Sequence, residues 1–517
     1  MLKYHRLIPR VRLRGARLIR VYTKSTVVFY SFVVVCFLMF ISLRTRRLSK
    51  LKDLAEVKFE ELNLELSRLP RPAEAEDSWK RPRIEDTAIL SAYLETRPEV
   101  VLEEDSSLQR DNHAWAMIRI IGIIPTRLEK SRLYCYHRYR YKESWERKDV
   151  VFEEKSIGTR LAAYKENFGM ANCAAHILCE LPGRLNRSER IRLPYEVTVT
   201  LEAVENARDL RDREFVVVRY PNNGWKDVSD ESRPREDGVA VCVQPLHHRF
   251  GDDLDLVAFV EFYRGMGVSR FTFYRDSVSP RVNKVLEHYV GEGIVTMIDW
   301  KLPDFYAFER NLRVDGIFAA LNDCLYRSTF HAGYRYVAGV DVDEYIVPKE
   351  HDNFQQMMEH LNPRGNDEQI GAWIFRNVFF YLMHPDDTST LAPNLPRLKL
   401  HVKTWRWRKT NSAWDRSKFI VQGRDIIDLG NHRVWLTKRS WSIFGRRYRE
   451  VTVEPKIASS HHYRKCETKI ETCWQRSTEI DRTAHRFTAR VAQRVSDVLR
   501  IVFPDEASRP GYNTSLP

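Results

Sequence analysis

Residues 336–348 read Tyr-Val-Ala-Gly-Val-Asp-Val-Asp-Glu-Tyr-Ile-Val-Pro. A run of small and apolar residues leads into Asp341, Asp343 and Glu344, and a second apolar run ends at Pro348. The pattern predicts a buried strand that ends in carboxylates, at the edge where open α/β sheets bind their ligands. Because side chains alternate along an extended chain, we expect Asp341 and Asp343 on the same side. Two carboxylates so placed can hold a hard divalent cation whose remaining ligands are phosphate oxygens.

Strand and helix patterns alternate in front of this segment. Strands are predicted at 239–243, 270–274 and 294–298, and apolar stripes with helical spacing separate them. Four such alternations within a segment of about 100 residues indicate a parallel, Rossmann-like sheet.

No phosphate-binding glycine loop accompanies this sheet. Gly265-Met-Gly267 precedes a predicted strand instead of following one, which excludes a dinucleotide fingerprint. A metal ion would therefore have to neutralise a diphosphate, and this combination fits a transferase that uses nucleotide-diphosphate sugars. A second D-x-D triplet, Asp253-Leu-Asp255, is predicted to begin a helix, where acidic side chains complement the dipole and need no further role.

The charge distribution argues against nucleic-acid binding. The net charge over 517 residues is +14, but residues 1–24 contain eight Lys or Arg and no acid, which leaves +6 for the rest. A short basic tail of this kind is typical of a segment that flanks a membrane.

An uncharged stretch of 19 residues follows the tail, at 25–43, between Lys24 and Arg44. As a helix it would span a bilayer core of about 30 Å, so we predict a single membrane anchor. A cleaved signal peptide is the alternative, but no Ala-x-Ala-like site follows. The basic tail favours a cytosolic N-terminus and a lumenal C-terminal part, with which the glycosylation sequons at Asn186 and Asn513 agree.

The cysteines suit an oxidising lumen. Cys36 lies in the predicted span, so seven remain, and we expect some to pair and at least one to stay free. Cys173 with Cys179, and Cys466 with Cys473, are close enough for short-loop disulfides. A zinc site is the alternative, but no C-x-x-C spacing exists.

These observations divide the chain into five parts. We predict a cytosolic tail at 1–24, a transmembrane signal anchor at 25–43, a charged stem at 44–110, a small β-rich domain at 111–235 and the α/β domain at 236–517.

From about residue 240 to 465 the chain resembles glycosyltransferase family 92, a family of type II Golgi membrane enzymes. The matching segments are 259–268, 271–277, 320–327, 340–348 and 460–464. The resemblance implies a GT-A-like fold, a mixed sheet with helices on both faces. It also implies an inverting transfer, best known for galactose from UDP-galactose to a glycan or glycoprotein acceptor.

The resemblance also implies roles for individual residues. Asp341 and Asp343 would hold Mn²⁺ together with the diphosphate, and His462 would be a further metal ligand, as imidazole accepts this ion. The alternative for His461 and His462 is a surface pair. His432 is a second candidate ligand.

The uridine side of the donor site is predicted after the first two strands. Gln244 follows the first strand and Asp276 the second, although Asp276 is also a common turn-forming residue type. Asn322 and Asp323 are polar residues on an otherwise apolar helix, where they would bind the donor or form hydrogen bonds across helices.

An inverting transfer needs a carboxylate that accepts the proton of the acceptor hydroxyl. Downstream candidates are Asp386, Asp387 and Asp415, of which we favour Asp415 because tryptophans surround it (Trp405, Trp407 and Trp414). These rings would form an acceptor platform, or else a core or a lid.

One segment departs from the family pattern. An Asn-Glu pair usually follows the first strand, whereas this chain has residues 247–253, His-His-Arg-Phe-Gly-Asp-Asp. Either Asp252 or Asp253 takes over that role, or the specificity differs. The changed segment keeps a second hypothesis open, a non-catalytic lumenal glycan-binding protein that retains the fold.

Overall fold

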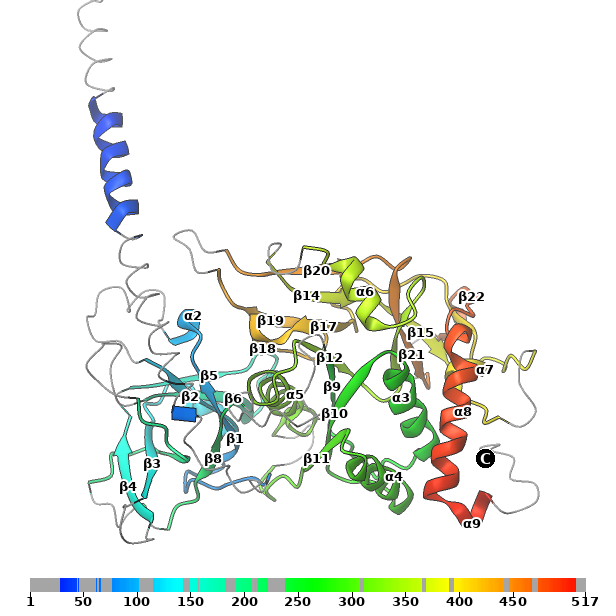
Figure 1. The fold of residues 1–517 in the computed structure, drawn as a ribbon, viewed down its shortest axis with the longest axis horizontal. Helices are drawn as coiled ribbons and strands as arrows, with labels where there is room; N and C mark the ends of the chain where they lie inside the picture. The colour runs from blue at the N-terminus through cyan, green and yellow to red at the C-terminus, as the bar shows by residue number, and fades with distance from the viewer. Residues whose placement is uncertain are drawn as a thin grey trace, which may run out of the picture.

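Two large sheets, with one helix between them, organise the structure, a computed structural model of the chain (Figure 1). The structure describes residues 28–43, 45, 62, 65–66, 77–101, 115–142, 149–156, 158–181, 191–205, 210, 212–221, 238–306, 311–364, 369–389, 395–440, 446–466 and 473–507.

The first sheet has the strand order β4-β3-β7-β8-β1-β2-β6-β5. Its strands are β1 (Ala88–Glu95), β2 (Met117–Pro125), β3 (Tyr134–Lys142), β4 (Asp149–Lys155), β5 (Thr159–Ala163), β6 (Asn172–Glu180), β7 (Glu196–Thr200) and β8 (Val216–Arg219). The pairs are antiparallel except β1 with β8.

The predicted stem at 44–110 therefore needs correction. Ala88–Glu95 is β1, and every residue of this strand is buried. The stem prediction rested on the charged and Pro-rich residues on either side of the strand, whereas the strand itself carries an apolar run that pairs with β2 and β8. The β-rich unit thus begins before residue 111.

The second sheet has the order β11-β10-β9-β12-β17-β14-β20. It contains β9 (Val239–Val243), β10 (Val268–Arg275), β11 (Val295–Asp299), β12 (Tyr336–Val340), β14 (Ile370–Phe375), β17 (Lys418–Gln422) and β20 (Arg449–Val453). β9 to β12 are parallel, as predicted, and β17 then runs antiparallel to β12. Because β10 and β12 flank β9 on opposite sides, the strand order reverses between β9 and β12, where doubly wound sheets bind ligands.

A small three-stranded sheet continues from the end of β12. β13 (Glu344–Pro348) pairs antiparallel with β21 (Ala458–Arg464), which runs parallel to β15 (Asn377–Tyr381). Two further ladders join β16 (Trp405–Trp407) with β22 (Thr478–Ile480), and β18 (Ile426–Leu429) with β19 (Val434–Thr437).

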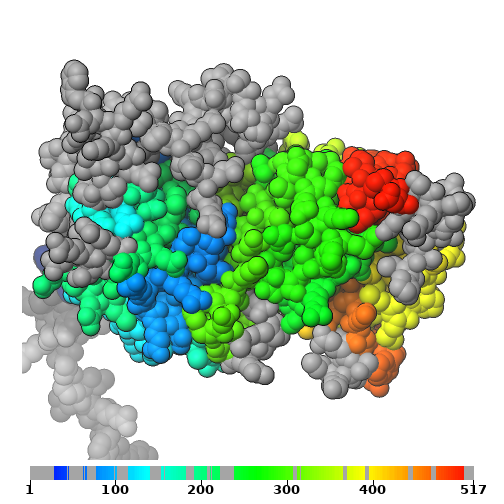
Figure 2. Space-filling view, turned by 90° about the horizontal axis from the view of Figure 1, so that it is seen from below, coloured from blue at the N-terminus to red at the C-terminus, as the bar shows by residue number. Residues whose placement is uncertain are grey.

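Helices cover both faces of the second sheet, as predicted. α3 (Asp253–Gly265), α4 (Pro280–Gly291) and α8 (His485–Val502) share one apolar core with it. α5 (Ile317–Tyr326) lies on the other face, between the two large sheets, and its core includes residues of both (Figure 1). In the space-filling view, the segments of the first sheet, in blue and teal, lie directly against the green segments of the second sheet and its helices (Figure 2). The short helices are α2 (Pro98–Val101), α6 (Phe354–Leu361), α7 (Lys399–Val402) and α9 (Pro504–Ala507).

The disulfides differ in part from the prediction. Cys466–Cys473 is confirmed, but Cys179 pairs with Cys135, and Cys173 is a buried free thiol. Cys173 and Cys179 lie six residues apart on one extended strand, roughly 20 Å, which is too far for a disulfide. Cys135 on β3 reaches β6 because the first sheet curls. A third disulfide, Cys242–Cys324, joins β9 to α5.

The described part of the predicted membrane span, residues 28–43, is helical with exposed apolar side chains. Among the described residues, no helix is both long enough and apolar enough to cross a membrane. Residues 1–27 and the sequons at Asn186 and Asn513 lie outside the described residues.

Candidate functional site

A cavity of about 400 Å³ lies at the carboxyl ends of β9 and β12, where the strand order reverses. Its walls come from the end of β9, the start of α3, the turn after β12 and the end of β21. The lining residues are Val243, Gln244, Pro245, Leu246, His247, Phe250, Asp252, Asp255, Asp341, Val342, Asp343, Leu382, Lys399, Tyr463, Arg464 and Lys465.

Asp341 and Asp343 lie in the turn between β12 and β13. Asp341 Oδ2 is 2.9 Å from Lys418 Nζ, while Asp341 Oδ1 is buried and has no hydrogen-bond partner among the described residues. Asp343 Oδ2 is 3.2 Å from His462 Nε2. Burial tends to raise the pKa of Asp343, but the charges of His462 and Lys418 outweigh it and hold the pKa below its usual value.

The pairing of β13 with β21 places Glu344 directly opposite His462. His462 Nδ1 lies 2.7 Å from Glu344 Oε1, so both ring nitrogens face carboxylates. The hydroxyl of Tyr263 on α3 donates to the carbonyl of Glu344 and accepts from the amide of Ile346, which fixes the start of β13.

The histidine pair is not on the surface. Because neighbouring side chains alternate, His461 points away from His462, and its ring centroid lies 4.6 Å from that of Phe380. Burial lowers the pKa of His461 to about 4.

Lys418 is a site residue that the sequence analysis did not identify. It is 1% exposed, and its Nζ lies 2.9 Å from Asp341 Oδ2, 2.9 Å from Glu344 Oε2 and 3.2 Å from Asn431 Oδ1. Lys418 is the first residue of β17, next to β12. The available signal was a lysine at the start of an apolar strand, Lys-Phe-Ile-Val-Gln.

A sequence model of glycosyltransferase family 92 matches residues 237–500, just over half of the chain. The chain belongs to glycosyltransferase family 92. A Caenorhabditis elegans protein described as a member of the same family is 30% identical over 141 residues. That match covers 26% of this family 92 chain and 26% of the length of the relative.

Solved structures give weak overall matches. The crystal structure of residues 1–349 of Staphylococcus aureus TarS matches with a TM-score of 0.24 and 10% identity, over 52% of this chain and 66% of that chain. Glucosyl-3-phosphoglycerate synthase from Mycobacterium tuberculosis matches with a TM-score of 0.19 and 10% identity, over 37% and 59%.

Gln244 also lines the cavity of this family 92 chain. The side-chain amide of Gln244 donates to Asn431 Oδ1 at 2.6 Å, and Asn431 Oδ1 also lies beside Lys418 Nζ. His432, the second metal candidate, is not a lining residue, and burial, aided by the charge of Lys418, lowers its pKa to about 3. Asp276 follows β10 but is not among the lining residues, and burial raises its pKa.

Asn322 and Asp323 do not lie at the cavity. Both are fully buried on α5. The Asn322 side chain bonds to the backbone of Leu429 in both directions, at 2.9 Å each. Asp323 accepts hydrogen bonds from two tyrosines and pairs with Arg327. These contacts are internal hydrogen bonds and ion pairs, to strands and to Arg327 and not only across helices, and the donor-binding role of the two residues stays a prediction.

The start of α3 forms another wall of the cavity. Asp252 caps the helix by accepting from the amide of Asp255 at 3.0 Å, as expected for an acidic helix start. Lys399 of α7 forms ion pairs with both carboxylates. Burial raises the pKa of Asp255 to about 7, although Lys399 opposes the shift. Asp253 instead pairs with Arg281, so it is Asp252 and Asp255 that line the cavity.

The predicted proton acceptors lie elsewhere. Asp415 is exposed and does not line the cavity. Asp386 pairs with Arg397 and Lys403, and Asp387 with Arg482.

Two of the tryptophans near Asp415 differ in exposure. Trp407 is buried, while Trp414 is 53% exposed and donates to Glu450.

The residues around the Asp341–Asp343 turn fit a divalent cation. Adjacent ligands of an octahedral ion lie about 3 Å apart, close to the 3.2 Å between Asp343 Oδ2 and His462 Nε2. Glu344 holds the other ring nitrogen, as carboxylates do for metal-bound histidines. Asp341 Oδ1 is an unused acceptor. Within the described residues, however, no three His, Cys, Asp or Glu side chains are grouped closely enough to hold a metal by themselves.

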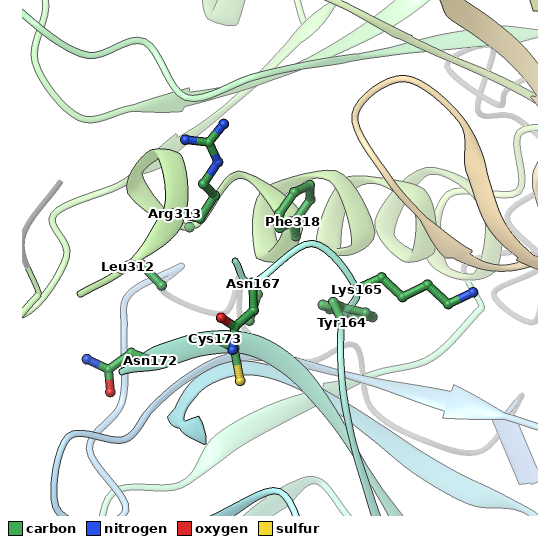
Figure 3. A pocket seen from close by; sticks show the side chains of 10 residues that line it. Tyr164, Lys165, Asn167, Asn172, Cys173, Leu312, Arg313 and Phe318 are labelled. Carbon is green, nitrogen blue, oxygen red and sulfur yellow. The ribbon is translucent and has the colours of Figure 1, made fainter. Parts of the chain in front are cut away.

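A second cavity lies between β6 and the start of α5, and its lining includes Asn167, Cys173, Leu312 and Phe318 (Figure 3). Its volume of about 10 Å³ is at most enough for one water molecule.

Proposed function

We propose that this chain transfers a hexose, galactose, from a UDP-sugar to a glycan or glycoprotein acceptor, with inversion at the anomeric carbon and with the help of Mn²⁺. The observation that carries the proposal is the arrangement of Asp341 and Asp343 at one cavity, with His462 Nε2 3.2 Å from Asp343 Oδ2 and with a buried oxygen of Asp341 that has no hydrogen-bond partner among the described residues. The cavity volume of about 400 Å³ lies within the usual range of small-molecule sites.

The charges beside the Asp341–Asp343 turn support the role of a cation in this proposal. Asp341, Asp343 and Glu344 bring three carboxylates, and Lys418 offsets one of them. The carboxylates that remain would oppose a diphosphate placed directly beside them. A bound Mn²⁺ would supply the charge that stabilises the departing UDP.

Other residues of the cavity would hold the rest of the donor. Gln244, fixed by Asn431, would contact the uridine side at the end of β9, and Asp276 would lie beyond it at the end of β10. Arg464 and Lys465 line the cavity beyond His462 and add positive charge for the phosphates.

The proton acceptor is assigned from the cavity lining. Asp255 lines the cavity and has a pKa near neutrality, which suits a general base once its contact with Lys399 is released. The variant Asp415→Asn serves as the comparison, because the sequence favoured Asp415 as the proton acceptor. Loss of kcat in Asp255→Asn with near-normal kcat in Asp415→Asn supports the assignment, and the opposite pattern refutes it.

We also propose that the chain is a type II Golgi membrane protein, anchored by residues 25–43 with the catalytic part in the lumen. The three disulfides among the described residues support an oxidising compartment. Protection of the C-terminal part from protease in sealed microsomes, and occupancy of the sequon at Asn186, would test this topology.

The activity test uses the full-length chain in detergent. UDP release from UDP-galactose, UDP-glucose and UDP-N-acetylglucosamine is measured against a panel of acceptor glycans, with Mn²⁺ and with EDTA. We expect Mn²⁺-dependent release that falls at least 100-fold in Asp343→Asn and stays normal in the exposed-site control Asp304→Asn. A folded sample without turnover on any donor, or a fully active Asp343→Asn variant, would overturn the proposal.

One observation favours a second function, glycan binding without catalysis. All four carboxylates among the described lining residues contact a basic side chain: Asp252 and Asp255 contact Lys399, Asp341 contacts Lys418, and Asp343 contacts His462. A non-catalytic protein would bind glycans on an array, while the same sample would release no UDP with or without Mn²⁺.

A further inference from the structure

Lys418 carries a buried charge between two carboxylates that flank the cavity. Its side chain is 1% exposed, and its ammonium lies 2.9 Å from both Asp341 Oδ2 and Glu344 Oε2. Burial of a lysine is costly unless its charge and its donors are matched. The two carboxylates and Asn431 Oδ1 provide three such partners. The ammonium group of Lys418 therefore contacts the residues that form and support the cavity wall.

We propose that Lys418 is a positioning residue that orients Asp341 directly, and His462 through Glu344, for binding of a divalent cation. The inference rests on the proposed function, because it concerns the same cation and the same donor.

The contacts to Asp341 divide the two oxygens of its carboxylate. Lys418 holds Oδ2 at 2.9 Å, and Oδ1 is buried without a hydrogen-bond partner in the part of the chain that the structure describes. A carboxylate with one oxygen fixed can rotate little, so the other oxygen keeps one direction. That leaves Asp341 Oδ1 as the atom available to a cation.

The contacts to Glu344 act on the histidine in the same way. Lys418 lies 2.9 Å from Glu344 Oε2, and Glu344 Oε1 lies 2.7 Å from His462 Nδ1. The ring is thereby held with Nε2 towards Asp343. Carboxylates that contact the second nitrogen of a metal-binding histidine orient the ring, and their loss costs metal affinity. Lys418 extends this chain of contacts by one residue.

Asn431 connects the same lysine to the donor side. Its Oδ1 faces Lys418 Nζ at 3.2 Å and accepts from the Gln244 amide at 2.6 Å. Loss of the lysine therefore disturbs Gln244 as well as Asp341, so we expect weaker binding of the cation in the presence of UDP.

The experiment measures Mn²⁺ binding by the full-length chain in detergent, from the electron paramagnetic resonance signal of free Mn²⁺, with UDP present. Lys418→Met keeps the length of the side chain and removes its charge. We expect Mn²⁺ affinity to fall by about 10- to 100-fold, the range known for residues that support metal ligands. The matched control is Lys438→Met, which removes another lysine that pairs with a buried aspartate, Asp425, outside the cavity lining.

The coupling between substitutions of Lys418 and Asp341 distinguishes a positioning role of Lys418 from a general effect on stability. If Lys418 acts in part through Asp341, the loss of Mn²⁺ affinity in the double variant Lys418→Met with Asp341→Asn is smaller than the sum of the two single losses. Additive losses, or an equal loss in Lys438→Met, would overturn the inference. Should Lys418→Met fail to fold, Glu344→Gln breaks the same chain of contacts. Unchanged Mn²⁺ affinity in Glu344→Gln would also overturn the inference.

The outcome also separates this inference from the proposed function. Wild-type protein that binds no Mn²⁺ in the presence of UDP would refute both. Wild-type protein that binds Mn²⁺, with an unchanged Lys418→Met variant, would refute the role of Lys418 alone.

Discussion

Replacement of Asp323 by Asn tests whether this carboxylate is structural, as its position on α5 indicates. Asp323 Oδ1 accepts from the Tyr93 hydroxyl at 2.6 Å, and Oδ2 accepts from the Tyr274 hydroxyl at 2.7 Å and from Arg327 Nε at 3.1 Å. These partners belong to β1, β10 and the short π-helix Arg327–His331 that continues α5. Burial tends to raise the pKa of Asp323, but the charges of Arg327 and Arg219 outweigh it, so the folded state holds the anion.

The magnitude follows from what asparagine cannot replace. Its Oδ1 can accept from one tyrosine, but its NH₂ group then faces two further donors. Removal of one partner from a buried ion pair costs about 3–5 kcal/mol. Arg327 keeps a second partner, since its two terminal nitrogens lie 3.1 and 3.0 Å from the oxygens of Asp77. We therefore expect the lower end, a loss of about 3 kcal/mol in the free energy of unfolding.

The assay is thermal unfolding of the full-length chain in detergent, followed by tryptophan fluorescence. A loss of about 3 kcal/mol should lower the melting temperature by about 5 °C. The control Asp304→Asn changes an exposed aspartate and should cost under about 0.5 kcal/mol. KM for the UDP-sugar should be unchanged in Asp323→Asn. A variant that melts as wild type while KM rises tenfold would refute the structural role and restore the donor-binding one.

Three further predictions concern stability. The double variant Cys242→Ala with Cys324→Ala should lose about 4 kcal/mol, because the disulfide closes a loop with a sequence separation of 82, and a loss below 1 kcal/mol on denaturant unfolding would contradict this. His137 is buried with a pKa lowered to about 4 by desolvation, so the unfolded chain gains a proton first as pH falls below about 6.5. Stability should therefore drop by about 2 kcal/mol at pH 5, and His137→Gln should flatten the dependence of melting temperature on pH; an unchanged slope speaks against it. A methyl group added at Gly339 would lie 2.6 Å from the Phe419 ring, so Gly339→Ala should cost about 1–3 kcal/mol in thermal unfolding, and a neutral effect would show that the ring moves freely.

Much of the second unit could be predicted from the sequence because its signals are local. The strands at 239–243 and 336–340 carry uninterrupted apolar residues, and apolar stripes at helical spacing predicted the helices between them. β1 was missed because charged residues surround it, and its burial comes from partners in distant strands. Cys173 and Cys179 were paired by proximity in sequence, but an extended strand separates them.

The candidate site divides in the same way. Asp341 and Asp343 were identifiable because an apolar strand leads directly into them, and His462 was identifiable through a resemblance. The roles of Asn322 and Asp323 stayed open because a polar residue on an apolar helix gives the same signal whether its partner is a ligand or a neighbouring element. The structure supplies those partners, Leu429 for Asn322 and Arg327 for Asp323.

The sequence by itself determined the order of strands and helices from residue 239 to residue 340 and the place of two carboxylates at the end of the last of these strands, because periodicity and alternation act over a few neighbouring residues. The tertiary structure alone decided which basic side chain lies beside which carboxylate. Lys418 and Asp341 are 77 residues apart and meet because β17 inserts antiparallel beside β12. His462 meets Glu344 because β21 pairs in register with β13. Contacts of this kind depend on strand pairing across the whole fold, and no local pattern in the chain encodes them.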